Sequence, residues 1–186
     1  MKYLIVGLGN IGDEYQHTRH NIGFDILDAF AKASNISFND RRYAFIGEAS
    51  FKGRKFILAK PTTYVNLSGK AVNFWLQKEN ISIENLLVVV DDIALPFGTF
   101  RLRPNGGDGG HNGLASINAI LGTQIYARLS FGIGNDFPIG TQVDYVLSGW
   151  SKEENEALLQ KMATGIEIIR SFATAGIQET MNRYNR

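Results

Sequence analysis

Apolar residues form short runs along the chain, and these runs predict strands. A continuous apolar run bounded by glycine or by acids is typical of a strand buried on both faces, and strict alternation is typical of a half-buried strand. Between residues 41 and 61 the pattern predicts a hairpin that turns at Lys52-Gly53 and ends at Pro61. The other predicted strands are 3–8, 84–92, 99–103 and 127–134.

Helical periodicity fills the segments between these strands. Apolar residues recur at helical spacing over 21–34, and Asn66 is a suitable N-cap for a helix over 67–79. Ser151 and Glu154 form a capping box at the start of a long helix that ends at Gly176. Further helical segments are predicted at 111–122, closed by Gly122, and at 178–184. Strands and helices therefore interleave, which predicts a single α/β domain over 1–186 with a central mixed, largely parallel, twisted sheet flanked by helices.

Composition and charge narrow the classes of protein. The 186 residues carry a formal net charge of +1, so a basic signal over the whole chain is missing, although a local basic patch remains open. Cysteine is absent, which fits a reducing cytosol. The N-terminal segment is too short and too soon polar for a signal sequence, and no apolar run reaches transmembrane length. These observations predict a cytoplasmic protein without a membrane partner.

The glycines gather in two places, 7–12 and 106–113. Gly7, Gly9 and Gly12 match the spacing of a dinucleotide fingerprint, which would suggest a nucleotide-binding oxidoreductase. That fold needs a helix that starts inside the motif, and here a polar segment intervenes. We therefore interpret the motif as a tight turn, or as a turn that presents Asn10 to a site.

A histidine and a carboxylate are the best candidates for chemistry. Asp91 and Asp92 end the most apolar predicted strand, where open α/β sheets place ligand sites, and one of the two is expected only to cap the following turn. The chain has no cysteine and no G-x-S-x-G elbow, and Ser68 is expected to make only a local capping contact. A His–Asp pair that activates water is the economical alternative.

A metal site is the competing interpretation. His17 and His20 lie three residues apart, but no established metal-ligand spacing is present, and His17 lies in a polar loop. We expect no metal. The residues that could complete a shell with them are Asp91, Asp92, Asp108 and His111.

Several sequence blocks resemble bacterial peptidyl-tRNA hydrolases, in that family's order and over almost the whole chain. They are "LIVGLGN", "EYQHTRHNIGF", "KPTTYVNLSGKAV", "VVVDDIALPFG", "GGDGGHNGL" and "RLSFGIG". The resemblance implies hydrolysis of the ester between a nascent peptide and the 3′-terminal ribose of tRNA, without a covalent intermediate, a metal or another cofactor. It also implies a monomeric α/β enzyme that binds the tRNA acceptor stem and 3′ end.

The resemblance also assigns site residues. His20 matches the family's catalytic base, and Asp91 matches its acid partner. Asn10 and Asn66 match asparagines that hold the substrate near the ester, and His111 and Asn112 match a pair that lines the same crevice. Tyr15, Tyr64 and Arg103 complete the expected substrate- and tRNA-binding set.

Four positions depart from the family pattern. Ile11 replaces a proline, so the turn after Asn10 should be less rigid. Ser130 replaces the second basic residue of a phosphate clamp, and Arg101 or Arg128 is expected to substitute, or tRNA to bind more weakly. Ala94 and Asp108 also differ, and the sequence assigns Asp108 no role. A protein that binds RNA but no longer cleaves the ester is the alternative that Ser130 leaves open.

Overall fold

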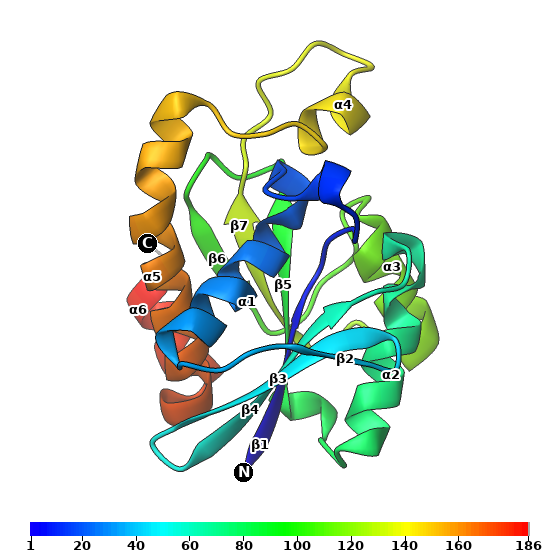
Figure 1. Ribbon diagram of the computed structural model, residues 1–186, viewed down its shortest axis with the longest axis vertical. Coiled ribbons are helices and arrows are strands. Elements are labelled where there is room, and N and C mark those ends of the chain that lie inside the picture. The colour runs from blue at the N-terminus through cyan, green and yellow to red at the C-terminus, as the bar shows by residue number, and fades with distance from the viewer. Residues whose placement is uncertain (186) are drawn as a thin grey trace.

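The computed structural model describes residues 1–185, and its centre is one seven-stranded sheet in the order β2-β3-β4-β1-β5-β7-β6 (Figure 1). The four central strands run parallel, and the pairs β2–β3, β3–β4 and β6–β7 are antiparallel. The strands are β1 Lys2–Gly7, β2 Asn39–Arg41, β3 Ala44–Phe51, β4 Arg54–Pro61, β5 Leu86–Asp92, β6 Phe100–Arg103 and β7 Ala127–Gly132. The predicted mixed sheet with a parallel centre is confirmed.

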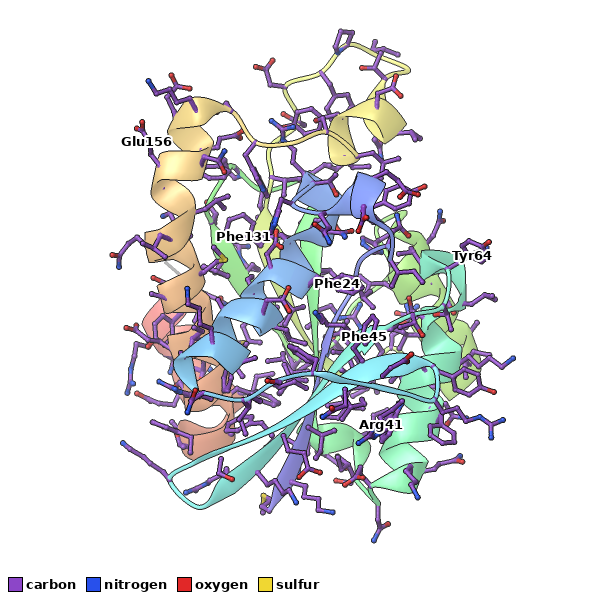
Figure 2. The ribbon with its side chains drawn as sticks, in the orientation of Figure 1. Phe24, Arg41, Phe45, Tyr64, Phe131 and Glu156 are labelled. Carbon is purple, nitrogen blue, oxygen red and sulfur yellow. The ribbon has the colours of Figure 1, made fainter. Side chains whose placement is uncertain are left out.

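Helices cover both faces of this sheet (Figure 1). One face packs against α1 Ile22–Ala33, α5 Lys152–Ala175 and α6 Ile177–Tyr184, and the other against α2 Ser68–Lys78 and α3 Asn112–Leu121. Side chains of a strand alternate between faces, so Val89 enters the first core and Val88 the second. Figure 2 shows Phe131 inside the molecule, whereas Tyr64 projects from its edge.

The periodicity predictions are confirmed for the long elements, including the hairpin turn at Lys52-Gly53 and the capping box of Ser151 and Glu154. The prediction that Asn66 caps α2 is wrong. Asn66 belongs to a 3₁₀ turn, Val65–Leu67, and Leu67 occupies the N-cap position without a side-chain bond. The 3₁₀ turn leads directly into the first turn of α2 in place of a side-chain cap. The hydroxyl of Ser68 donates to the carbonyl of Val65 at 2.7 Å, the local contact that was predicted for Ser68.

Two short elements escaped the sequence patterns. Strand β2 is three residues long and fully exposed, so it shows no alternation of buried and exposed positions. Helix α4, Gln142–Val146, is five residues long and has no buried residue. Elements of this length are too short for a hydrophobic period to be recognised.

The glycine motif serves close packing at the end of β1. A Cβ added at Gly7 would lie 2.3 Å from the carbonyl oxygen of Gly23, so the strand end and the start of α1 touch through their backbones. Helix α1 begins at Ile22, well beyond the motif. The helix that a dinucleotide fingerprint requires is therefore absent from the motif, as the sequence indicated.

The topology leaves a crevice at one edge of the sheet. Strand β1 pairs with β4 on one side and with β5 on the other, so the chain leaves β1 toward one half of the sheet and later enters the other half. The carboxyl ends of these parallel strands meet at the same edge, which is where open α/β sheets bind ligands. Among residues 1–185 no helix is both long enough and apolar enough to cross a membrane.

Candidate active site

A cavity of about 590 Å³ opens at this edge. Its walls come from the segment after β1, the 3₁₀ turn Arg19–Asn21, the turn before α2, the end of β5, the glycine loop before α3, and α4. The predicted site residues that line it are Asn10, His20, Tyr64, Asn66, Asp91, Arg103, His111 and Asn112.

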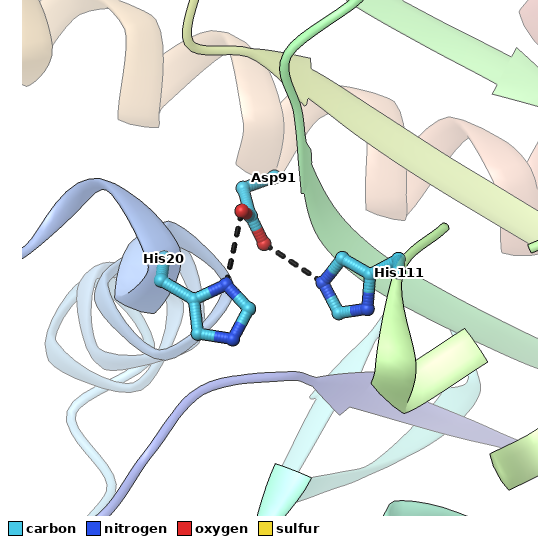
Figure 3. Close-up of side chains that lie close together, drawn as sticks. All are labelled: His20, Asp91 and His111. Atoms are coloured by element: carbon cyan, nitrogen blue, oxygen red, sulfur yellow. Dashed lines mark hydrogen bonds and ion pairs between the residues drawn. The ribbon is translucent and has the colours of Figure 1, made fainter. Parts of the chain in front are cut away.

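Asp91 lies between two histidines at the end of β5 (Figure 3). Its Oδ2 is 3.0 Å from Nδ1 of His20, and its Oδ1 is 2.9 Å from Nε2 of His111. His20 comes from the turn that leads into α1, and His111 from the N-cap of α3, on the opposite face of the sheet. The carboxylate is 5% exposed and the imidazoles 13% and 11%, so the cluster is nearly enclosed.

Hydrogen bonds fix the tautomer of His111. Its Nδ1 accepts from the backbone N–H of Gly113 at 3.1 Å and of Leu114 at 3.4 Å, at the start of α3. A ring nitrogen that accepts carries no proton, so the proton of neutral His111 is on Nε2 and is donated to Asp91. The lone pair of His111 is thus occupied by the helix, and His111 holds Asp91 in place.

The same logic gives His20 a different role. Its Nδ1–H donates to Asp91, so Nε2 carries the lone pair, and Figure 3 shows that nitrogen on the side of the ring away from Asp91. Because His20 also lines the cavity, Nε2 can take a proton from a molecule bound there. Geometry therefore distinguishes the two histidines: Nε2 of His20 can act on a bound molecule, whereas Nδ1 of His111 is bonded to the start of α3.

The pKa values follow this arrangement. Burial alone would lower the pKa of His20, but the hydrogen bond to Asp91 and the charge of Asp91 outweigh it, so the pKa is raised above 6.5. Burial opposes ionisation of Asp91, yet the contacts with His111 and His20 outweigh burial and hold the pKa of Asp91 below its ordinary value. The pair thus combines an ionised carboxylate with a stabilised imidazolium.

Asparagine side chains surround this cluster. The backbone of Asn10 is braced by the side chain of Asn21, which accepts from the Asn10 N–H and donates to the Asn10 carbonyl, both at 2.8 Å. This brace fixes the turn where Ile11 replaces proline. Asn66 and Asn112 line the cavity from the turn before α2 and from the first residue of α3.

The glycine loop presents His111 to Asp91. Gly109 and Gly110 have φ of 57° and 84°, values that side chains rarely adopt, so these positions favour glycine for its conformation. Asp108 closes the loop: its side chain accepts from the N–H of Gly110 at 2.8 Å, and its carbonyl accepts from the N–H of His111 at 2.9 Å. The role that the sequence left open for Asp108 is therefore a local turn.

Basic side chains lie at one end of the cavity. Arg103 and Arg128 both line it, and they occupy paired positions on β6 and β7. Arg128 donates to the carbonyls of Gly107 and Gln124, each at 3.0 Å, and stacks on Tyr126. Ser130 also lines the cavity. Of the two substitutes predicted for the base missing at Ser130, Arg128 lines the cavity, whereas Arg101 does not.

Three other predicted candidates take no part in the cluster of Asp91 and the two histidines, although Asp92 lines the cavity. Tyr15 does not line the cavity, and its contact with tRNA stays a prediction. His17 pairs with Asp25 at 3.1 Å. Asp92 accepts from the N–H of Ala94 at 2.8 Å, so it is the acid that caps the turn. Within residues 1–185, one group of side chains could hold a metal ion. It consists of His20, Asp91 and His111, whose ligand atoms lie within 4.8 Å of one another.

Asn21, Arg19 and the α4 wall were not predicted from the sequence. Asn21 and Arg19 flank His20, and that adjacency was the available signal for both. Helix α4 carried no periodic signal, because it is short and exposed. Helix α4 lines the cavity with Gln142, Val143 and Val146, and the next residue, Leu147, lines it as well.

Comparison with known proteins identifies the family of the chain. The sequence profile described as peptidyl-tRNA hydrolase matches residues 4–186. Peptidyl-tRNA hydrolases of Phocaeicola vulgatus and Bacteroides fragilis are 61% and 60% identical over 186 residues, and each match covers 100% of both chains.

A solved structure is similar over nearly the same length. The crystal structure of peptidyl-tRNA hydrolase from Acinetobacter baumannii has a TM-score of 0.91 and 30% identity, covering 98% of this chain and 94% of that chain. The chain thus belongs to the peptidyl-tRNA hydrolase family and has the activity of that family.

Proposed function

We propose that the chain hydrolyses the ester between the peptide and the 3′-terminal ribose of peptidyl-tRNA with a water molecule activated by His20 and Asp91. The observation that carries the proposal is the hydrogen bond between Nδ1 of His20 and Asp91, which leaves Nε2 available at the cavity. A base needs a free lone pair beside the reacting group, and His20 meets this condition, whereas His111 does not.

The reaction proceeds in two steps. Water attacks the ester carbonyl carbon, its proton passes to Nε2 of His20, and the carbonyl becomes a tetrahedral oxyanion. The bond from this carbon to the ribose oxygen then breaks, and the imidazolium returns its proton to that oxygen. The products are a free peptide acid and a tRNA with a 3′-terminal ribose hydroxyl. Asp91 stabilises the imidazolium between the steps.

The amides supply the remaining stabilisation. The side chains of Asn10, Asn66 and Asn112 each carry two N–H donors, and all three line the cavity. Donors aimed at a developing oxyanion act strongly in an enclosed site, because little water competes with them. We assign these amides to the ester carbonyl and to the adjacent peptide group.

Arg103 and Arg128 are the proposed phosphate contacts for the acceptor stem. Burial and the nearby charge of Arg103 lower the pKa of Arg128, so an anion between them would relieve their repulsion. Each terminal nitrogen of Arg128 gives one hydrogen bond to a carbonyl and keeps a second N–H. Ser130 beside them leaves the space open.

Hydrolysis of N-acetyl-phenylalanyl-tRNA tests the chemistry. We expect wild type to release the acyl amino acid with a chelator present, and His20→Asn to lose about 10²- to 10⁴-fold in kcat, the usual contribution of a general base. His17→Asn is the matched control, because His17 pairs with Asp25 outside the cluster. Wild-type turnover by His20→Asn would overturn the assignment of the base.

Direct attack by water has its own test. The enzyme is quenched during turnover, and its intact mass is measured. We expect the mass of unmodified protein, since no covalent intermediate forms. An increase equal to the mass of the acyl group would show a covalent step instead.

Gel filtration with and without deacylated tRNA checks the prediction that the enzyme works as a monomer.

A further inference from the structure

Arg19 is a buried cation next to the catalytic histidine, and the chemistry above gives it no task. It is 9% exposed and does not line the cavity. Lysine and arginine are almost never this buried without partners. Its contacts therefore indicate what it does.

The side-chain hydrogen bonds of Arg19 all lead to residues 148–154, which connect α4 to the first turn of α5. The guanidinium donates to Glu154 at 2.9 Å, to the carbonyl of Gly149 at 2.6 Å and to the hydroxyl of Ser148. Its backbone N–H donates to the carbonyl of Ser148 at 3.0 Å, and Thr18 and Gly149 form an isolated antiparallel bridge. The catalytic turn and residues 148–149 are thus joined through both backbone and side chain.

Aromatic rings enclose the same guanidinium. Its central carbon lies 4.3 Å from the centre of the Tyr145 ring and 5.5 Å from that of Trp150. Tyr145 belongs to α4 and donates its hydroxyl to the carbonyl of Ile133 at 2.6 Å. A planar guanidinium can stack and form several directed hydrogen bonds at once, which a lysine ammonium cannot do.

The anchored segment forms one wall of the cavity. Val143, Val146 and Leu147 line the cavity together with His20, and Val143 is 68% exposed. Helix α4 has no fully buried residue, and Tyr145 and Val146 pack only partly buried against the core. Arg19 adds a hydrogen-bonded link between the segment that follows this wall and the turn that carries His20.

We propose that Arg19 is a positioning residue that fixes α4 beside His20, so that the apolar wall of Val143, Val146 and Leu147 holds the acyl part of the substrate. Apolar side chains suit the side chain of an acyl amino acid and offer nothing to phosphates. This inference rests on the proposed function, because it assumes that the acyl group binds beside His20.

The test compares Arg19→Lys and Glu154→Gln with Arg170→Lys. Arg170 also stacks on aromatic rings, Phe51 and Phe30, but it belongs to α5 and does not line the cavity. Glu154→Gln keeps the capping box, since glutamine also accepts there, and removes only the charge opposite Arg19. It remains a test if Arg19→Lys does not fold.

Both test variants should weaken substrate binding and leave the chemistry intact. We expect KM for N-acetyl-phenylalanyl-tRNA to rise about tenfold with kcat within about twofold, the pattern of lost uniform binding. Inhibition by deacylated tRNA should not change, because the wall holds the acyl part. The acid limb of the pH profile should stay in place, because His20 and Asp91 still pair. Arg170→Lys should match wild type in each measurement.

Hydrogen exchange measures the anchoring without any turnover. Amides in 141–150 should exchange faster in Arg19→Lys and Glu154→Gln than in wild type, while those of β1 and β5 stay protected. Unchanged exchange would refute the anchoring, and faster exchange with unchanged KM would refute the role of the wall. Failure of the proposed chemistry is distinguishable, because it would appear as full turnover by His20→Asn.

Discussion

Asp91→Asn tests the division of labour between the two histidines. An asparagine at this position offers one acceptor oxygen and one donor NH₂ group in place of two acceptors. His111 keeps its proton on Nε2, since its Nδ1 accepts from the start of α3, so the oxygen of the new amide faces His111. The NH₂ group then faces Nδ1 of His20 and forces the proton onto Nε2. The base is left in the wrong tautomer.

The loss of charge adds to the loss of the tautomer. His20 and Asp91 approach to 3.0 Å in an almost enclosed cluster. At an effective dielectric constant of about 20, unit charges about 4 Å apart attract by about 4 kcal/mol, which corresponds to about a thousandfold in rate. The corresponding Asp→Asn change in a serine-protease triad removes the charge and the tautomer together and costs about 10⁴-fold, so we expect kcat to fall by about 10³- to 10⁴-fold.

The pH profile gives a second, independent measurement. Asp91 supplies both contributions that raise the pKa of His20, whereas burial lowers it. The acid limb of kcat/KM should lie above pH 6.5 in wild type and move below 6.5 in Asp91→Asn, because neutral His20 is the active form. Asp92→Asn is the matched control, since Asp92 also lines the cavity but accepts from the N–H of Ala94 and bonds to neither histidine. An Asp91→Asn enzyme within about tenfold of wild type, or with an unmoved acid limb, would refute this reasoning.

Three further predictions concern stability and tRNA binding. Burial raises the pKa of Asp25 to about 6, so the folded state binds its proton more tightly than the unfolded state, and stability falls as pH rises from about 4 to about 6. Asp25→Asn should therefore raise the free energy of unfolding near neutral pH by about 1–3 kcal/mol, which corresponds to a rise in Tm of a few degrees. The gain should disappear below about pH 4, and an equal gain at both pH values would contradict this reasoning. Arg103→Gln should reduce the slope of log KM against log salt concentration by about one, because one phosphate contact is lost. Arg41→Gln on the exposed strand β2 is the control. An unchanged slope in Arg103→Gln would exclude a phosphate contact. Gly7→Ala should lower the free energy of unfolding, measured with denaturant, by more than about 3 kcal/mol, because the added Cβ would collide with Gly23. Gly107→Ala should lower it by less than about 1 kcal/mol, because a Cβ there meets nothing within 4 Å.

The sequence by itself determined the periodic elements and indicated the groups that we propose for catalysis. Strand β5 and helix α5 are long enough for their apolar residues to show a clear period, and capping residues marked the start of α5. Asp91 was expected at the site because it ends the most apolar strand of an open sheet. His20 and the asparagines came from uncommon blocks that resemble a known family.

Only the tertiary structure decided how these groups divide the work. The end of the apolar strand by itself did not separate Asp91 from Asp92, and only the family resemblance favoured Asp91. The fold separates them, because Asp91 faces two imidazoles while Asp92 accepts from its own turn. Asp91, which both imidazoles face, lies 71 residues from His20 and 20 residues from His111 along the chain. Likewise, Arg19 meets Glu154 across 135 residues. Such contacts arise where separate elements pack, so no local pattern of residues specifies them.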